Sequence, residues 1–237
     1  MILVDMSQIM MASIMMQMHM SKKSEPDEEM VRHMILNSLR MYRTRFLSEF
    51  GEMVLCYDSR HYWRRDYFPE YKHSRRKSRG TDDKNWDIIF NCLNTIKEEV
   101  KSNMPYKSVE VYGAEADDVI ATLCSESSNE VMILSGDKDF IQLQKFPNVK
   151  QYSPITKKMI NGMNPDDYLK EHVLKGDTSD GVPNVLSPDN TFVDGIRQRP
   201  LSKKKIATMV EGDFPNDEVK RNYQRNKKLI DLTCSPD

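Results

Sequence analysis

The chain has 237 residues, 38% of them hydrophobic, which suffices for one sizeable α/β domain with a helical appendage or for two small domains. Its 35 Lys and Arg nearly balance its 36 Asp and Glu, so the local distribution of charge is more informative than the total of −1. The apolar runs are too broken to span a membrane, and the start, MILVDMSQ, lacks the basic region of a signal peptide, which argues against a membrane or secreted protein. The four cysteines include no C-x-x-C pair, which argues against a disulfide framework or a zinc site.

The first two thirds of the chain are predicted to alternate strands with helices. The predicted strands are 2–6, 53–57, 108–112 and 131–134, and the predicted helices are 28–50, 85–102 and 115–125. Strands separated by helices imply a mostly parallel sheet, so the expected fold class is α/β. After about residue 160 the pattern becomes helical and polar, with predicted helices at 165–174, 202–211 and 217–232. This part is interpreted as a small helical subdomain.

Methionine is unusually common, with 17 residues, many of them crowded between Met6 and Met20. A copper site or a calmodulin-like surface would also use methionine. Adaptable packing in the core is the favoured interpretation, because the flexible thioether side chain fills irregular gaps.

Nine carboxylates occur in five short clusters, in the motifs ILVDMS, MVLCYDS, GAEADD, SGDKD and GDTSD. They are Asp5, Asp58, Glu115, Asp117, Asp118, Asp137, Asp139, Asp177 and Asp180. Four clusters end a strand-like run or start a helix-like one, and in an open α/β sheet such ends meet at one crevice. Unpaired carboxylates would repel one another there, whereas a hard divalent cation such as Mg²⁺ takes oxygen ligands. The pattern predicts a metal-dependent phosphodiesterase.

Each cluster also has a structural explanation. Asp5 and Asp58 could cap helices that follow strands, and acids in the first turn of a helix, as at Glu115, favour the helix dipole in any protein. The GDTSD motif is typical of turns. The coincidence of all five clusters favours the metal site over these separate explanations.

Residues 60–79, RHYWRRDYFPEYKHSRRKSR, hold eight Lys or Arg and five aromatic residues. Cationic groups bind phosphates and aromatic rings stack on exposed bases, so this composition indicates a contact with single-stranded nucleic acid. A solvated basic loop is the alternative. Two further basic sets could follow a duplex backbone: Lys203, Lys204 and Lys205, and Arg221, Arg225, Lys227 and Lys228.

These motifs, in the order ILVDMSQ, VLCYDS, YWRR to YKHSRR, YGAEADDVIATL, ILSGDKDFIQL and LKGDTSDGVPNV, resemble those of the flap endonuclease superfamily of structure-specific 5′ nucleases. Within it the chain is most similar to the ribonucleases H of T-even bacteriophages. The resemblance runs nearly end to end. It implies a PIN-like α/β nuclease core at 1–160, which includes a basic helical arch at 60–80, and a duplex-binding helical subdomain at 161–237.

The resemblance also implies residue roles. The first metal ion would be held by Asp5, Asp58, Glu115, Asp117 and Asp137, the last of these also counted as catalytic, with Asp118, Asp139, Asp177 and Asp180 around the second. Lys72 and Arg75 would assist catalysis beside the scissile phosphate, and Tyr71 would stack on the nucleic acid. The nucleic-acid-binding set is completed by Arg64, Arg65, Arg76, Lys203, Lys204 and Lys205.

Two features depart from the family pattern. Many relatives carry a helix-hairpin-helix with a Gly-Ile-Gly turn and a bound K⁺, whereas here PNVLSPDNTFVDGIRQRPLS follows Gly181 and Val182 and interrupts the hairpin. A K⁺ site is therefore doubtful. T-even relatives are also expected to continue with a helical segment beyond NKKLIDLTCSPD.

The expected reaction uses two Mg²⁺ ions, which Mn²⁺ can replace, to hydrolyse a phosphodiester. The resemblance implies substrates with 5′ ends or flaps, both DNA and RNA·DNA hybrids, in primer removal. Partners would be a single-strand-binding protein and a replication polymerase or clamp. A monomer in the host cytoplasm, without membrane contact, is expected. Two other functions stay open: a non-catalytic nucleic-acid-binding protein, and a phosphatase with Asp5 as its nucleophile.

Overall fold

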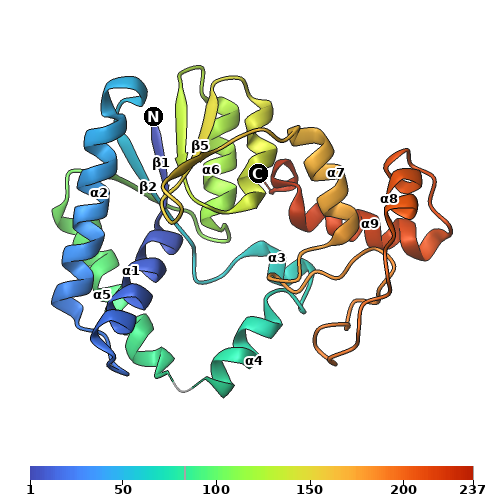
Figure 1. Ribbon diagram of the computed structural model, residues 1–237, viewed down its shortest axis with the longest axis horizontal. Coiled ribbons are helices and arrows are strands. Elements are labelled where there is room, and N and C mark those ends of the chain that lie inside the picture. Colours follow the sequence, from blue (N-terminus) through green and yellow to red (C-terminus); the bar gives the residue numbers. More distant parts are fainter. Residues whose placement is uncertain (83, 237) are drawn as a thin grey trace. The chain divides into compact units, whose positions relative to one another are not determined.

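The computed structural model describes residues 1–82 and 84–236, apart from the side chains of Arg76, Ser78 and Thr81. Its six-stranded sheet has the order β3-β2-β1-β4-β5-β6. The strands are β1 (Ile2–Asp5), β2 (Met53–Tyr57), β3 (Lys107–Glu110), β4 (Val131–Leu134), β5 (Val149–Ser153) and β6 (Lys158–Ile160). The first five pair in parallel and only β6 is antiparallel (Figure 1). The predicted α/β fold with a mostly parallel sheet is confirmed.

Contacts divide the chain into two compact units, Met1–Arg60 with Asp82–Asn161, and His61–Thr81 with Gly162–Asp237. The first unit holds the sheet, α1 (Met6–Ser21), α2 (Glu28–Phe50), α5 (Trp86–Asn103), α6 (Ala116–Glu126) and the 3₁₀ helix η1 (Lys138–Lys145). The second holds α3 (Trp63–Tyr67), α4 (His73–Thr81), α7 (Pro165–Lys175), α8 (Lys203–Val210), α9 (Asp217–Ile230) and the 3₁₀ helix η2 (Leu232–Cys234). Residues 61–81, which the sequence analysis assigned to the α/β core, thus share their contacts with the helical unit.

The core of the first unit lies on both faces of the sheet. Ile2 and Val4 of β1 pack in one cluster with buried residues of α1, α2 and α5, and α6 contacts β1, β2 and β3. All four residues of β4 are buried, as expected of a parallel strand covered by helices on both faces. Because β1 pairs in parallel with both β2 and β4, the carboxyl ends of these three strands lie at one edge of the sheet.

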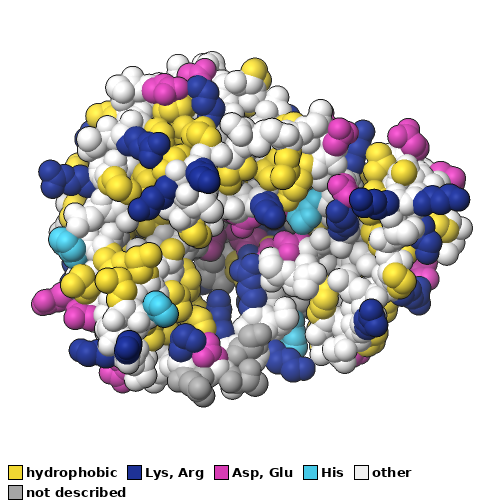
Figure 2. Space-filling model, viewed as in Figure 1, with side chains coloured by type: hydrophobic (Ala, Val, Ile, Leu, Met, Phe, Trp, Pro, Cys, Tyr) yellow, Lys and Arg dark blue, Asp and Glu magenta, His cyan; other side chains and the backbone are white. Residues whose placement is uncertain are grey.

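Helix α1 was not predicted, because its sequence is apolar on nearly every face and shows no 3.6-residue stripe. Met6, Met10 and Met18 are buried, which agrees with packing as the role of the methionines. Met16 and Met20 are exposed, and Figure 2 shows hydrophobic side chains on the face that carries α1 and α2.

The second unit is held by two small apolar clusters and by buried amides. Phe68 and Tyr71 pack with residues of α7 and α9. In α9 the side chain of Asn226 donates to the carbonyls of Val173 and Pro183, both at 2.9 Å. The bond to Pro183 helps to fix the long connection between α7 and α8, residues 176–202. Among the described residues, no helix is both long and apolar enough to cross a membrane.

Candidate active site

Five of the predicted metal ligands lie at the carboxyl edge of the sheet. Asp5 ends β1, Asp58 follows β2, Asp137 follows β4, and Glu115 and Asp117 begin α6. The strand order reverses between β1 and β4, which is the position where open α/β sheets bind their ligands. These five residues are called the acidic cluster below.

Hydrogen bonds hold two members of the acidic cluster in place. The hydroxyl of Ser7 and the backbone N–H of Ala116 donate to the two oxygens of Asp58, at 2.7 and 2.8 Å. The hydroxyl of Ser135 donates to Asp5 at 2.9 Å. The sequence analysis did not single out Ser7 and Ser135, although each lies within two residues of a strand end in ILVDMS and ILSGD.

The acids of the cluster perturb one another. Burial, followed by the charge of Asp58, raises the pKa of Asp5 to about 6. Burial also raises the pKa of Asp117 well above its usual value, and the charges of Asp5, Asp137, Glu115 and Asp58 add to this effect. Carboxylates that interact this strongly must lie close together, and their repulsion disfavours the ionised forms of Asp5 and Asp117.

The chemistry of the acidic cluster fits a hard divalent cation. Its five side chains offer only carboxylate oxygens, the donors that Mg²⁺ and similar ions prefer. A bound cation would also offset the repulsion that raises the pKa values of Asp5 and Asp117.

Two other predicted ligands lie in the first unit, each near the start of a helix. Asp118 is buried, and its carboxylate accepts a hydrogen bond of 2.9 Å from the backbone N–H of Glu115 in a capping box at the start of α6. Asp139 is half-buried, and its backbone N–H donates to the carboxylate of Asp137 at 3.0 Å, which caps η1. Direct metal ligation by Asp118 and Asp139 stays a prediction.

The last two predicted ligands belong to the second unit. The carboxylate of Asp177 accepts the backbone N–H groups of Ser179 and Asp180 at 2.7 and 3.3 Å, which is the turn expected of GDTSD. The carboxylate of Asp180 contacts Tyr71, Lys72 and Arg75 instead. The second unit therefore places Asp180 against the cations that were predicted to assist catalysis.

Residues 61–81, called the basic segment below, differ from a freely solvated loop. Arg64, a predicted nucleic-acid contact, is buried, and its Nε donates to the carbonyl of Leu229 at 2.8 Å. Tyr71, the predicted stacking residue, is buried among apolar residues and donates from its hydroxyl to Asp180. In this structure both side chains anchor the segment to the helical unit, and their predicted contacts with nucleic acid stay predictions.

The other predicted contacts differ in their exposure. Arg65 is half-buried and donates to the hydroxyl of Tyr62 at 2.6 Å. The side chain of Arg76 lies outside the described residues. Lys203, Lys204 and Lys205 are exposed in the first turn of α8, where Figure 2 shows several Lys and Arg side chains. By contrast, Arg225 is buried and paired with Asp189.

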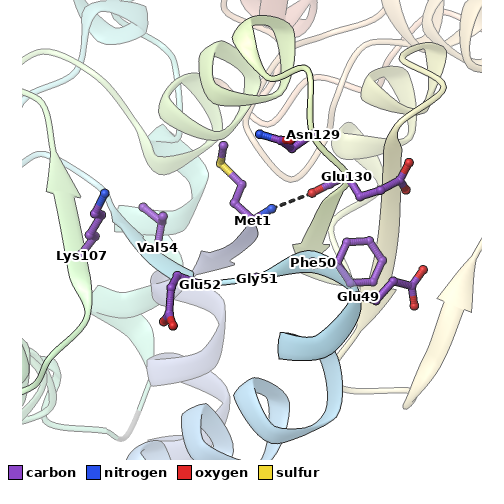
Figure 3. A pocket seen from close by; sticks show the side chains of 9 residues that line it. All are labelled: Met1, Glu49, Phe50, Gly51, Glu52, Val54, Lys107, Asn129 and Glu130. Atoms are coloured by element: carbon purple, nitrogen blue, oxygen red, sulfur yellow. Dashed lines mark hydrogen bonds between the residues drawn. The ribbon is translucent and has the colours of Figure 1, made fainter.

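A separate pocket of about 480 Å³ lies at the opposite, amino end of the strands (Figure 3). It is lined by Met1, Glu49, Phe50, Gly51, Glu52, Val54, Lys107, Asn129 and Glu130. Its glutamates are already paired, Glu52 with Arg43 and both Glu49 and Glu130 with Lys150. The acidic cluster is therefore the stronger candidate for a site of chemistry.

Known proteins resemble this chain in sequence. The family model for the 5′-3′ exonuclease N-terminal resolvase-like domain matches residues 1–173. Ribonuclease H of Enterobacteria phage T4 is 34% identical, in a match that covers 99% of this chain and 82% of that protein. Flap endonuclease Xni of Shewanella sp. (strain MR-4) is 29% identical over 52% of this chain and 48% of its own length.

Solved structures share the fold. A bacteriophage T5 flap endonuclease in complex with DNA and metal ions matches 98% of this chain and 88% of its own, with a TM-score of 0.67 and 17% identity. A bacteriophage T5 5′-exonuclease with bound zinc ions matches 98% of this chain and 89% of its own, with the same TM-score and 16% identity. The predicted nuclease fold is thereby confirmed.

Proposed function

Because the chain belongs to the 5′-3′ exonuclease family of nucleases, we propose that it is a Mg²⁺-dependent 5′ nuclease that removes RNA primers and 5′ flaps by phosphodiester hydrolysis. The acidic cluster is the observation that carries this proposal. Five carboxylates meet where the strand order of a parallel sheet reverses. Burial and repulsion by neighbouring acids raise the pKa values of Asp5 and Asp117, and a divalent cation would offset that repulsion.

Two Mg²⁺ ions are proposed, with Mn²⁺ as a substitute. Asp5, Asp58, Glu115, Asp117 and Asp137 would hold the first ion. When bound, such ions lower the pKa of a water molecule and stabilise the charge that develops on the phosphate and its leaving group. The hydroxyls of Ser7 and Ser135 orient the carboxylates of Asp58 and Asp5, so they would set the direction in which these ligands point.

The second unit would supply the nucleic-acid contacts. Lys72 and Arg75 are proposed to stabilise the negative charge of the scissile phosphate, and Lys203, Lys204 and Lys205 to contact the phosphates of a duplex. The T5 relative, whose structure holds DNA and metal ions, supports a nucleic-acid substrate for a protein of this fold. A role in replication, beside a single-strand-binding protein and a polymerase or clamp, is proposed from the phage T4 relative named ribonuclease H.

One assay tests the proposal. The protein is incubated with 5′-labelled flap, nicked and RNA·DNA hybrid substrates, with Mg²⁺ and with EDTA. We expect release of short 5′ products from all three substrates with Mg²⁺ and none with EDTA. Equal cleavage in EDTA, or binding of each substrate without any cleavage in Mg²⁺ or Mn²⁺, would contradict the proposed function.

A further inference from the structure

Strand β5 carries a fully buried polar residue where a strand of a parallel sheet usually carries an apolar one. Gln151 lies in the middle of β5, which pairs with β4 on one side and β6 on the other. A parallel strand that is covered on both faces normally consists of apolar residues, as β4 does. Burial of an amide group costs free energy unless hydrogen bonds replace those to water, so the partners of Gln151 show what its side chain does.

The side-chain amide of Gln151 is directed to the loop that follows β4, residues 135–137, called the ligand loop below. Its Nε2 donates to the carbonyl of Ser135 at 3.0 Å and to the carbonyl of Asp137 at 2.6 Å. Its Oε1 accepts from Nε2 of Gln144 at 3.0 Å. The flipped amide would turn its oxygen toward two carbonyls that can only accept, so the amide has one favourable orientation. Both of its N–H groups therefore hold the ligand loop.

Further contacts hold the middle of the ligand loop. The backbone N–H of Gly136 donates to Oε1 of Gln8 at 2.6 Å. A Cβ on Gly136 would lie 2.9 Å from Oγ of Ser153, so a side chain at this position would require Ser153 to move. Gln151 joins the residue before Gly136 and the residue after it to a single amide. The path of the loop is thus set by side chains of β5 and α1.

The ligand loop carries a member of the acidic cluster. Asp137 is exposed, and its carboxylate accepts the N–H of Asp139 at 3.0 Å. Its charge contributes to the raised pKa values of Asp5 and Asp117, so its carboxylate lies near theirs. An aspartate side chain is short and adopts few rotamers, so the position of its carboxylate follows closely from the position of its backbone. Fixing the backbone of the ligand loop therefore limits where the carboxylate of Asp137 can lie.

We propose that Gln151 is a positioning residue of the metal site, whose amide holds the ligand loop so that the carboxylate of Asp137 is directed to the acidic cluster. This inference rests on the proposed function, in which Asp137 is a metal ligand. Groups that orient a metal ligand affect binding of the ion strongly, and their loss typically costs about 10–100-fold in affinity or activity. All residues of this arrangement belong to the first unit.

Metal binding without nucleic acid tests the role of Gln151. Gln151→Met keeps the length of the side chain and removes its hydrogen bonds. The matched control is Gln17→Met, because Gln17 is also buried and accepts the backbone N–H of Asp27 at 3.1 Å, at the start of α2. Titration with Mn²⁺, followed by electron paramagnetic resonance, should give a dissociation constant about tenfold higher in Gln151→Met and within about twofold of wild type in Gln17→Met. An unchanged constant in Gln151→Met, or an equal loss in both variants, would overturn the proposal.

A second variant covers the case in which Gln151→Met does not fold. Gln144 is half-buried, and Gln144→Ala removes the donor to Oε1 of Gln151 while it leaves the buried amide in place. The amide then loses one of the bonds that orient it, and the dissociation constant for Mn²⁺ should rise by about threefold. Wild-type affinity in a folded Gln144→Ala, with Gln151→Met unfolded, would overturn the proposal.

A double variant separates an effect through Asp137 from general damage to the fold. In a protein that already carries Asp137→Asn, the further change Gln151→Met should weaken Mn²⁺ binding by no more than about twofold. A further tenfold loss would show that Gln151 does not act through Asp137 and would overturn the proposal. A wild-type protein that binds Mn²⁺ but cuts no substrate would refute the proposed function, while the binding constants still decide the role of Gln151. A wild-type protein that binds no Mn²⁺ would overturn both.

Discussion

The hydroxyl of Ser135 donates a hydrogen bond of 2.9 Å to the carboxylate of Asp5, which ties the end of β4 to the end of β1. The other oxygen of the same carboxylate accepts the backbone N–H of Gln8 at 3.0 Å and caps α1. Asp5 is thus buried and fixed from two sides while it lies beside other acids. Burial and the neighbouring acids disfavour the ionised form of Asp5, whereas binding of a cation requires that form.

Asp5→Asn is expected to stabilise the protein in EDTA at pH 7.5. The pKa of Asp5 is raised from 3.8 to about 6 by burial and then by Asp58. Since the folded state binds this proton more tightly than the unfolded state, the stabilisation is complete below about pH 4 and is lost as the pH rises through about 6. A shift of about two pH units corresponds to about 3 kcal/mol at most, and we expect about 1–3 kcal/mol.

Urea unfolding of both proteins between pH 4 and 8 measures this effect, with Glu126→Gln at the exposed end of α6 as the control. The difference between wild type and Asp5→Asn should grow from pH 4 to pH 7. Mg²⁺ should stabilise wild type more than the variant. A variant less stable than wild type in EDTA at pH 7.5 would contradict the electrostatic account of the cluster.

Lys72→Ala is expected to lower the single-turnover rate by on the order of a hundredfold, because a preorganised positive charge gains most from the charge that develops in the transition state. Binding should change much less. The matched variant Lys204→Ala, at an exposed position of α8, should weaken binding and leave the single-turnover rate near that of wild type. Affinity lost in Lys72→Ala with an unchanged rate would instead make Lys72 a simple phosphate contact.

Cleavage should require a free 5′ end or a single-stranded flap. Tyr67 is 49% exposed in the basic segment, and an aromatic ring gains from stacking only on bases that are already unpaired. A covalently closed duplex circle should resist the enzyme, whereas the same sequence with a 5′ flap should be cut. Tyr67→Ala should weaken binding of the flap more than binding of the duplex. Equal cleavage of both substrates would leave the basic segment as a general basic surface.

Salt dependence provides a further test of the same segment. Cationic side chains that neutralise phosphates release counterions, so the logarithm of the binding constant should fall linearly with the logarithm of the salt concentration. Replacing Lys203, Lys204 and Lys205 together by Gln should reduce this slope, because all three are exposed. An unchanged slope would remove these lysines from the proposed duplex contact.

The alternation of strands and helices was predictable from the sequence because β1, β2 and β4 are apolar runs bounded by polar residues. Helix α1 was missed because its methionines leave no polar face to define a period. Strands β5 and β6 were also missed, since VKQYS and KMI are short and partly polar, and only pairing with β4 makes them strands.

The acidic cluster was predictable because each member is tied to a strand end or a helix start, and those positions follow from the fold class. The burial of individual basic residues could not be predicted from the sequence. In the sequence, Arg64 is one of several cations in a basic run. In the structure it is buried and donates a hydrogen bond to the carbonyl of Leu229, 165 residues away. The contacts of Asp180 could not be predicted for the same reason, since its partners on the basic segment are distant in sequence.

The acidic cluster is the central claim, and Asp137→Asn tests it most directly. Asp137 is exposed, and its carboxylate caps η1 by accepting the N–H of Asp139. Asn is an equally good cap, so the fold should be kept while a proposed metal ligand is lost. Cleavage of a 5′-labelled flap in Mg²⁺ and binding of the same substrate are measured for wild type, Asp137→Asn and the control Glu126→Gln. The account predicts that Asp137→Asn binds within a few-fold of wild type and does not cut, and wild-type cleavage by this variant would contradict it.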